Sequence, residues 1–98
     1  MTKKDPIKQK IATIDAMLQI VDLAFMDPEE YGELKKDIAI LSDFIGTQAA
    51  RSKPIPAPLK EQITLLAQLQ IVTEQKEDAD KIKDMLIKLR KACEKERK

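Results

Sequence analysis

The chain contains no histidine and no tryptophan, and Cys93 is the one cysteine among its 98 residues. Histidine is the commonest general base and metal ligand near neutral pH, so its absence removes most catalytic and metal-binding arrangements. A single cysteine can form neither an intramolecular disulfide nor a zinc site. Because no other catalytic constellation stands out, we expect a protein that is not an enzyme and that binds no cofactor, metal or small-molecule substrate.

Glycine and aromatic residues are scarce as well. The chain has two glycines and three aromatic side chains, whereas 36% of its residues are charged. This composition favours helix, because strands need more valine, threonine and aromatic residues. Gly32 and Gly46 stand far apart, so there is no glycine-rich phosphate loop. The net charge of +1 argues against a nucleic-acid-binding protein that relies on electrostatics alone.

Long uninterrupted apolar segments are also missing. The apolar run over residues 14–26 is broken by Asp15, Gln19 and Asp22, and no cleavage site follows the N-terminal lysines. The run is therefore neither a signal sequence nor a membrane anchor. Because a single cysteine fits a reducing compartment, we expect a cytoplasmic protein with no membrane partner.

Prolines divide the chain into segments. Asp5-Pro6 and Asp27-Pro28 each place a capping carboxylate before a proline at the first helical position. No helix could include the three closely spaced prolines of residues 54–58. The sequence thus predicts an all-α protein. Its predicted parts are an antiparallel helical hairpin over 1–50 with helices at 6–26 and 28–50, a Pro-rich linker at 51–57, and a long C-terminal helical region within 58–98.

Apolar residues in these segments alternate steps of three and four, the spacing of a coiled-coil or helical-bundle seam. The predicted seams consist of Ile7, Ile11, Ile14, Leu18, Val21 and Phe25; of Tyr31, Leu34, Ile38, Leu41 and Ile45; and of Ala79, Ile82, Leu86, Leu89 and Cys93. The position of Cys93 on the last seam indicates a small core residue rather than a nucleophile.

The polar segment between Thr73 and Asp80 leaves two architectures open. In one, it forms a turn that closes a four-helix bundle, with Thr73 or Asp78 as the cap of the last helix. In the other, one continuous helix of about 39 residues spans about 60 Å. Seam spacing continues across the junction through Leu65, Leu69, Val72, Lys76 and Ala79. The bundle therefore has either three long helices or four.

The segment from Gln62 to Thr73 contains no charged residue. A helix that is apolar on all sides must be buried on all sides, and twelve residues are too few to span a membrane. We therefore expect a homodimer, or a helical partner protein, to cover this segment and the broad apolar flank of the first helix. The expected interface consists of Ile63, Leu65, Leu66, Leu69, Val72, Met17 and Ile20.

Charge is unevenly distributed along the chain. Residues 15–43 carry eight acidic and two basic side chains, whereas residues 81–98 carry eight basic and three acidic ones. If the two regions pack together, their charges are complementary and favour one orientation. An acidic partner or nucleic acid is the alternative use of the basic residues, through Lys88, Arg90, Lys91, Lys95 and Arg97.

Two functions follow from these patterns. The first is a non-enzymatic protein–protein interaction module that self-associates or acts as an adaptor or chaperone for a helical partner. The alternative is a small nucleic-acid-binding regulatory protein that uses the basic C-terminal helix.

Overall fold

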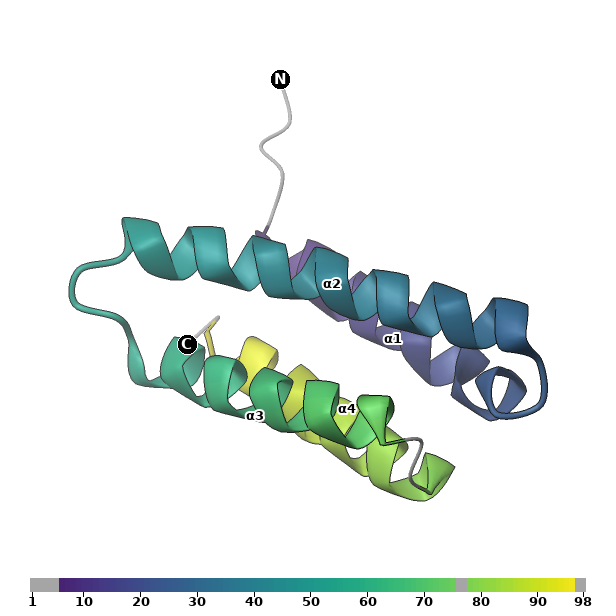
Figure 1. Cartoon of the computed structure of the whole chain (residues 1–98). Coiled ribbons are helices and arrows are strands. Elements are labelled where there is room, and N and C mark those ends of the chain that lie inside the picture. The colour runs from purple at the N-terminus through teal and green to yellow at the C-terminus, as the bar shows by residue number, and fades with distance from the viewer. Residues whose placement is uncertain (1–5, 76–77, 97–98) are drawn as a thin grey trace.

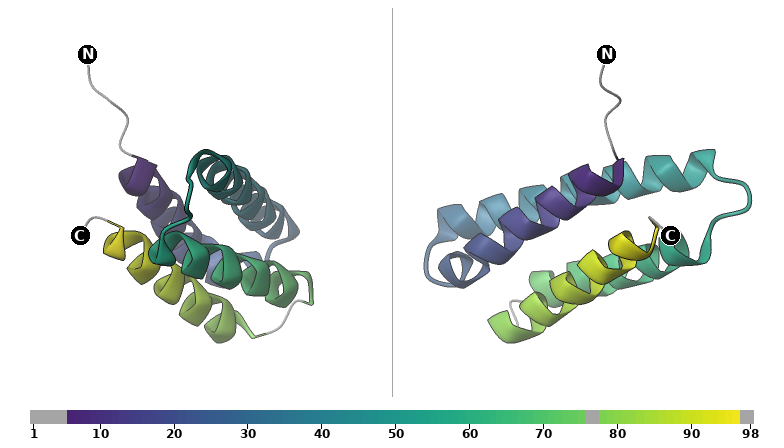
Figure 2. Two further views of the ribbon diagram at one scale, coloured as in Figure 1. Left: turned by 90° about the vertical axis from the view of Figure 1, so that its left-hand side faces the viewer. Right: turned by 180° about the vertical axis from the view of Figure 1, so that it is seen from behind.

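The computed structural model describes residues 6–75 and 78–96, and within them it contains helices and no strand. The helices are α1 (Pro6–Ala24), α2 (Pro28–Arg51), α3 (Ala57–Glu74) and α4 (Ala79–Lys95). They surround a common core as a ring in which α1 packs on α2, α2 on α3, α3 on α4, and α4 on α1 (Figures 1 and 2). The prediction of an all-α helical bundle is confirmed.

The start of α2 follows the predicted capping arrangement. The Asp27 carboxylate accepts a hydrogen bond of 3.0 Å from the Glu29 amide, and Pro28 occupies the first turn. Upstream, α1 ends at Ala24, two residues earlier than predicted, because the amides of Met26 and Asp27 both bond to the Leu23 carbonyl. The expected cap at Asp5 lies outside the described residues.

The structure decides between the two architectures in favour of four helices. Here α3 ends at Glu74, and α4 begins at Ala79 after Asp78, whose carboxylate accepts a 3.0 Å hydrogen bond from the Asp80 amide. The alternative of a continuous helix is wrong, since Asp78 caps a new helix. Thr73 is not that cap, because its hydroxyl donates to the Leu69 carbonyl one turn earlier in α3.

A short connection over residues 52–56 joins α2 to α3, so both helices extend one residue further into the predicted linker. Ser52 donates from its hydroxyl to the Gln48 carbonyl at 2.9 Å and ends α2. Ile55 packs against the core from within the connection. The linker is therefore part of the folded unit, and one bundle includes both halves of the chain.

The core confirms the predicted seams of α2 and α4, and it confirms that of α1 in part, since Ile14 and Val21 are buried. In α1 the buried residues are Lys10, Ile14, Met17, Val21 and Ala24, whereas the predicted seam residue Phe25 is 38% exposed. The buried residues and the predicted seam are two different series with steps of three and four residues, and the two series share Ile14 and Val21. The pattern that faces the core begins with a lysine, which a search for apolar residues passes over.

Complementary charges do pair within one chain, as the sequence suggested. Arg90 of α4 bonds to Asp15 of α1 at 2.8 Å, and Lys83 bonds to Asp22 at 2.8 Å. The two ion pairs lie about two helical turns apart along the α1–α4 contact. Because they are partly exposed, they favour this pairing of helices more than they add stability.

We expect Asp27→Ala to lower the free energy of unfolding by about 1 kcal/mol, because the Glu29 amide loses its acceptor. Urea unfolding followed by circular dichroism measures the change. Asp27→Asn is the matched control, since asparagine caps about as well. Equal stability of Asp27→Ala and wild type would contradict the capping role.

Candidate functional site

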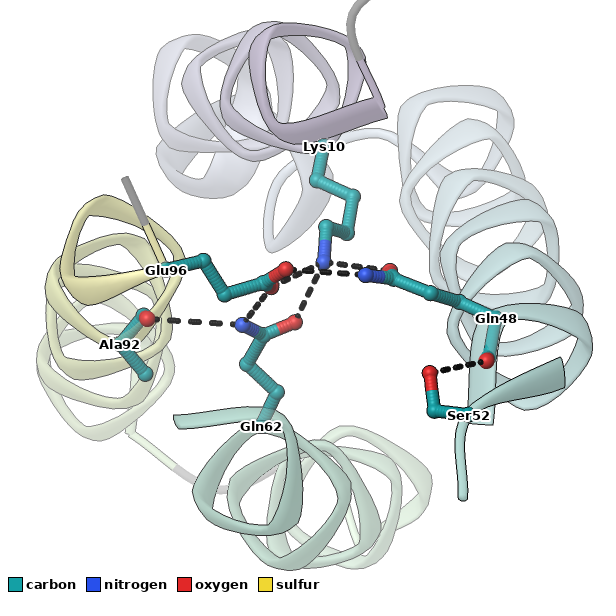
Figure 3. A network of polar contacts seen from close by, with 6 residues as sticks. All are labelled: Lys10, Gln48, Ser52, Gln62, Ala92 and Glu96. Carbon is teal, nitrogen blue, oxygen red and sulfur yellow. Dashed lines mark hydrogen bonds and ion pairs between the residues drawn. The ribbon is translucent and has the colours of Figure 1, made fainter. Parts of the chain in front are cut away.

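A polar layer crosses one end of the otherwise apolar core. It consists of Lys10, Gln48, Gln62 and Glu96, one residue from each helix or its end (Figure 3). Each member continues the core seam of its own helix at the same spacing of three or four residues. Apolar spacing alone does not identify these four residues as a set. The predicted seams of α2 and α4 reach Gln48 and Glu96 when each is extended by three residues, but the predicted seam of α1 passes over Lys10.

The Lys10 ammonium is the centre of the polar layer. Its nitrogen donates to Gln48 Oε1 at 2.7 Å, to Gln62 Oε1 at 2.8 Å and to Glu96 Oε1. All three donors of the ammonium are therefore used. The Lys10 side chain is fully buried, and the Glu96 side chain is 10% exposed. The positive charge is thus removed from water and compensated by one carboxylate and two amide oxygens.

The two glutamines link the charges in a second way. Gln48 donates from Nε2 to Glu96 Oε2 at 2.9 Å, and Gln62 donates from Nε2 to Glu96 Oε1 and to the Ala92 carbonyl. Each amide thus presents its oxygen to the ammonium and its nitrogen to the carboxylate. Within the residues that the structure describes, every buried side-chain nitrogen or oxygen has a hydrogen-bond partner.

The network determines the ionisation of Glu96. Burial alone would raise the pKa of this carboxyl, but hydrogen bonds from Lys10, Gln62 and Gln48, together with the charge of Lys10, outweigh burial. The pKa of Glu96 is consequently lowered from its ordinary value of 4.5. The carboxylate therefore remains ionised at neutral pH, as the buried ammonium requires.

Cys93 lies in the core close to this layer, and its location there is confirmed. Burial raises the pKa of the Cys93 thiol to about 11, although the positive charge of Lys10 opposes that shift. The residue is thus a neutral thiol at physiological pH and a poor nucleophile. With the Lys10 donors fully used, the layer offers neither an activated nucleophile nor a free base, and its chemistry is that of a structural contact.

Two further findings concern residues 6–75 and 78–96. There, no group of three histidine, cysteine or acidic residues is placed to hold a metal ion. Over the same residues, every helix is too short or too polar to cross a bilayer.

The structure separates the predicted interface residues into three groups. Met17, Leu66 and Leu69 lie inside the bundle core, so the expectation that they need a partner to cover them is wrong. Ile20, Leu65 and Val72 are partly buried and pack against that core. Ile63 is the member of the set that is exposed, at 39%. The four-helix ring covers more of α3 than the uncharged stretch suggested.

Three of the exposed apolar residues of α3 form a stripe, which we call the outer face: Ile63, Ala67 and Ile71. Ile71 is 58% exposed, and Ala67 is exposed between the two isoleucines. Their spacing of four residues places them along one side of the helix. Ala67 and Ile71 also line a shallow hollow on this side of the bundle.

A groove between α2 and α3 borders the outer face. One hollow of about 240 Å³ is lined in part by Gly46 of α2 and by Ile63 and Ala67 of α3. A second, of about 390 Å³, lies towards the exposed Lys35–Glu74 ion pair. At Gly46 an added Cβ would meet no atom within 4 Å, so the groove is open there.

A second exposed apolar group lies at the turn between α1 and α2. It comprises Leu23, Phe25 and Met26, of which Met26 is 77% exposed. These residues lie at a tip of the bundle, and the hollows described above do not include them.

The basic residues of α4 are largely engaged in ion pairs. Lys88 pairs with Asp84, Arg90 with Asp15 and Glu94, and Lys95 with Glu61. Lys91 is exposed, and Arg97 lies outside the described residues. Acidic neighbours thus offset much of the positive charge of this helix, which weakens the case for nucleic acid as its partner.

Comparison with protein-family models, with curated proteins and with solved structures gives no match for this chain.

We expect Lys10→Met to lower the free energy of unfolding by about 3 kcal/mol, because it leaves the Glu96 carboxylate buried without its cation. Replacing the whole layer with Lys10→Met, Gln48→Leu, Gln62→Leu and Glu96→Leu should restore stability to within about 1 kcal/mol of wild type. Urea unfolding measures both variants. If Lys10→Met is as stable as wild type, the ammonium is not held as described.

The lowered pKa of Glu96 predicts acid sensitivity. A carboxyl whose pKa is lower in the folded than in the unfolded state contributes stability above its unfolded pKa, and this stability is lost as the pH falls. We expect the contribution to decline from about pH 4.5 downwards. Over this range Glu96→Gln should lose less stability than wild type in urea melts. If the free energies of unfolding of the two proteins fell equally with pH, the lowered pKa of Glu96 would be contradicted.

Proposed function

We propose that the protein is a non-enzymatic protein–protein interaction module that binds a helix on the outer face of α3. The observation that carries the proposal is the exposure of Ile63 and Ile71 on either side of Ala67. Exposed apolar side chains that form a continuous stripe beside a groove are typical of docking surfaces. Self-association and binding of a separate adaptor or client protein both belong to this class.

The chemistry of the surface favours a helical ligand. Ile63, Ala67 and Ile71 repeat every four residues, so a second helix lying along α3 would contact all three. Residues 63–71 extend over about 12 Å at 1.5 Å per residue, which corresponds to two turns of a partner helix. Small residues at Ala67 and at Gly46 in the adjacent groove leave room for a close approach.

The nucleic-acid alternative has less support. An electrostatic binding surface needs basic side chains that are free to meet phosphates. Lys88, Arg90 and Lys95 instead form ion pairs with carboxylates of this chain. Aromatic side chains that could stack on bases are missing from α4.

Selection from a library of helical peptides tests this proposal without knowledge of the natural partner. We expect the selected peptides to carry apolar residues at helical spacing and to bind Ile63→Glu at least about tenfold more weakly than wild type. The reason is that binding would bury the new carboxylate against apolar side chains.

Ile87→Glu is the matched control, because Ile87 lies on α4 and is exposed to a similar extent, 43% against 39%. Its affinity for the peptides should remain within about twofold of wild type, since only groups in the contact carry binding energy. Circular dichroism verifies that both variants fold. Peptides that respond equally to the two variants, or that respond only to Ile87→Glu, would contradict the proposed surface.

A further inference from the structure

We propose that the helix bound by the outer face is α3 of a second copy of the chain, running antiparallel to the first with a two-fold axis beside Ala67. The inference rests on the proposed function, because it uses the same face, and it specifies the partner, its orientation and two further contact residues. Those residues are Lys60 and Glu74, which are exposed at the two ends of the outer face.

The apolar stripe of the outer face is symmetric about Ala67. Ile63 precedes Ala67 by four residues, and Ile71 follows it by four. A two-fold interface requires that when one residue contacts another, the reciprocal contact also exists. An antiparallel pair centred on Ala67 meets this requirement, because Ile63 of each copy then lies beside Ile71 of the other.

The central residue allows the two helices to approach closely. In the antiparallel pair, the two Ala67 side chains face each other at the two-fold axis. Alanine projects only a methyl group, so helix backbones can come near enough for the flanking isoleucines to interdigitate. The stripe is small, and we therefore expect a weak dimer whose populated fraction rises with protein concentration.

Charge complementarity supplies a second, independent argument. Lys60 lies seven residues before Ala67 and Glu74 seven residues after it, so both belong to the same side of the helix. The antiparallel dimer places Lys60 of each copy next to Glu74 of the other. A parallel pair would instead place Lys60 beside Lys60 and Glu74 beside Glu74, which is repulsive. The charges thus select the antiparallel orientation.

These contacts can form only between chains. Lys60 and Glu74 are fourteen residues apart on one helix, or about 21 Å, so they are too distant to pair within a copy. Within its own chain, Glu74 pairs with Lys35 of α2 at 3.3 Å, and the Glu74 side chain is 67% exposed. The carboxylate therefore remains accessible to a lysine of the second copy.

Sedimentation equilibrium from about 1 µM to about 1 mM protein tests for the dimer. We expect the wild type to associate, Ile71→Glu to weaken dimerisation by about 100-fold, and the Ile87→Glu control to behave as wild type. Ile71 is mostly exposed, so its variant should retain the circular dichroism spectrum of the folded bundle.

Charge exchange tests the orientation. Lys60→Glu and Glu74→Lys should each weaken their own dimer by about tenfold, because each places like charges together at both ends of the interface. When the two variants are mixed, every such contact again joins opposite charges. The mixed sample should therefore associate about as strongly as wild type.

A wild type that remains monomeric over the whole range would overturn the dimer. So would a dimer that ignores Ile71→Glu, or variants whose mixture associates no better than either variant alone. Peptide binding that still depends on Ile63 would, in those cases, leave the proposed function intact with the helix of another protein as the ligand. If the chain does not dimerise and peptide binding does not depend on Ile63, both the proposed function and the dimer are rejected.

Discussion

The buried ammonium of Lys10 is the constraint on which the arrangement of the four helices depends. Removing this charge from water is costly, and the cost is offset only when Glu96, Gln48 and Gln62 all reach it. Each of the four groups comes from a different part of the ring. If α3 slipped by about one turn in either direction, Leu59 or Leu66 would take the place of Gln62 and its oxygen would be lost. We therefore interpret the layer as a device that selects one alignment of helices, at some expense of stability.

The other polar contacts between helices are compatible with this alignment but are too weak to determine it. The Asp15–Arg90 and Asp22–Lys83 pairs join α1 to α4 but are partly exposed, and such pairs contribute about 1 kcal/mol or less. At the opposite end of the core, the Tyr31 hydroxyl of α2 donates to the Thr73 carbonyl of α3. The groove between α2 and α3 lies between that contact and the polar layer. Polar contacts therefore connect the two helices at both ends, and the groove separates them in between.

The sequence predicted the bounds of α1 and α2 to within two residues, because the signals involved are local, but it left open whether the C-terminal half forms one helix or two. Asp27 and Asp78 act as caps through their own side chains, and the seams of α2 and α4 are each a single unambiguous pattern. The polar layer could not be predicted in this way. Lys10 is buried only because residues 38 to 86 positions away in the chain supply its partners. Local apolar spacing carries no information about that compensation. It therefore placed Phe25 rather than Lys10 on the core side of α1, although it assigned Ile14 and Val21 to the core correctly.

The uncharged stretch of α3 suggested that a partner chain covers its apolar residues, but the structure divides these residues between the core and the surface. Leu66 and Leu69 serve the core, whereas Ile63 and Ile71 are left on the surface. A surface on which two identical copies meet cannot carry a charge at its two-fold axis, because the same charge would face itself. It can carry opposite charges at equal distances on either side, where each meets its opposite. In the proposed dimer, Ala67 occupies the axis, and Lys60 and Glu74 occupy the symmetric flanking positions. In this dimer, the lack of charge from Gln62 to Thr73 keeps like charges from facing each other near the axis.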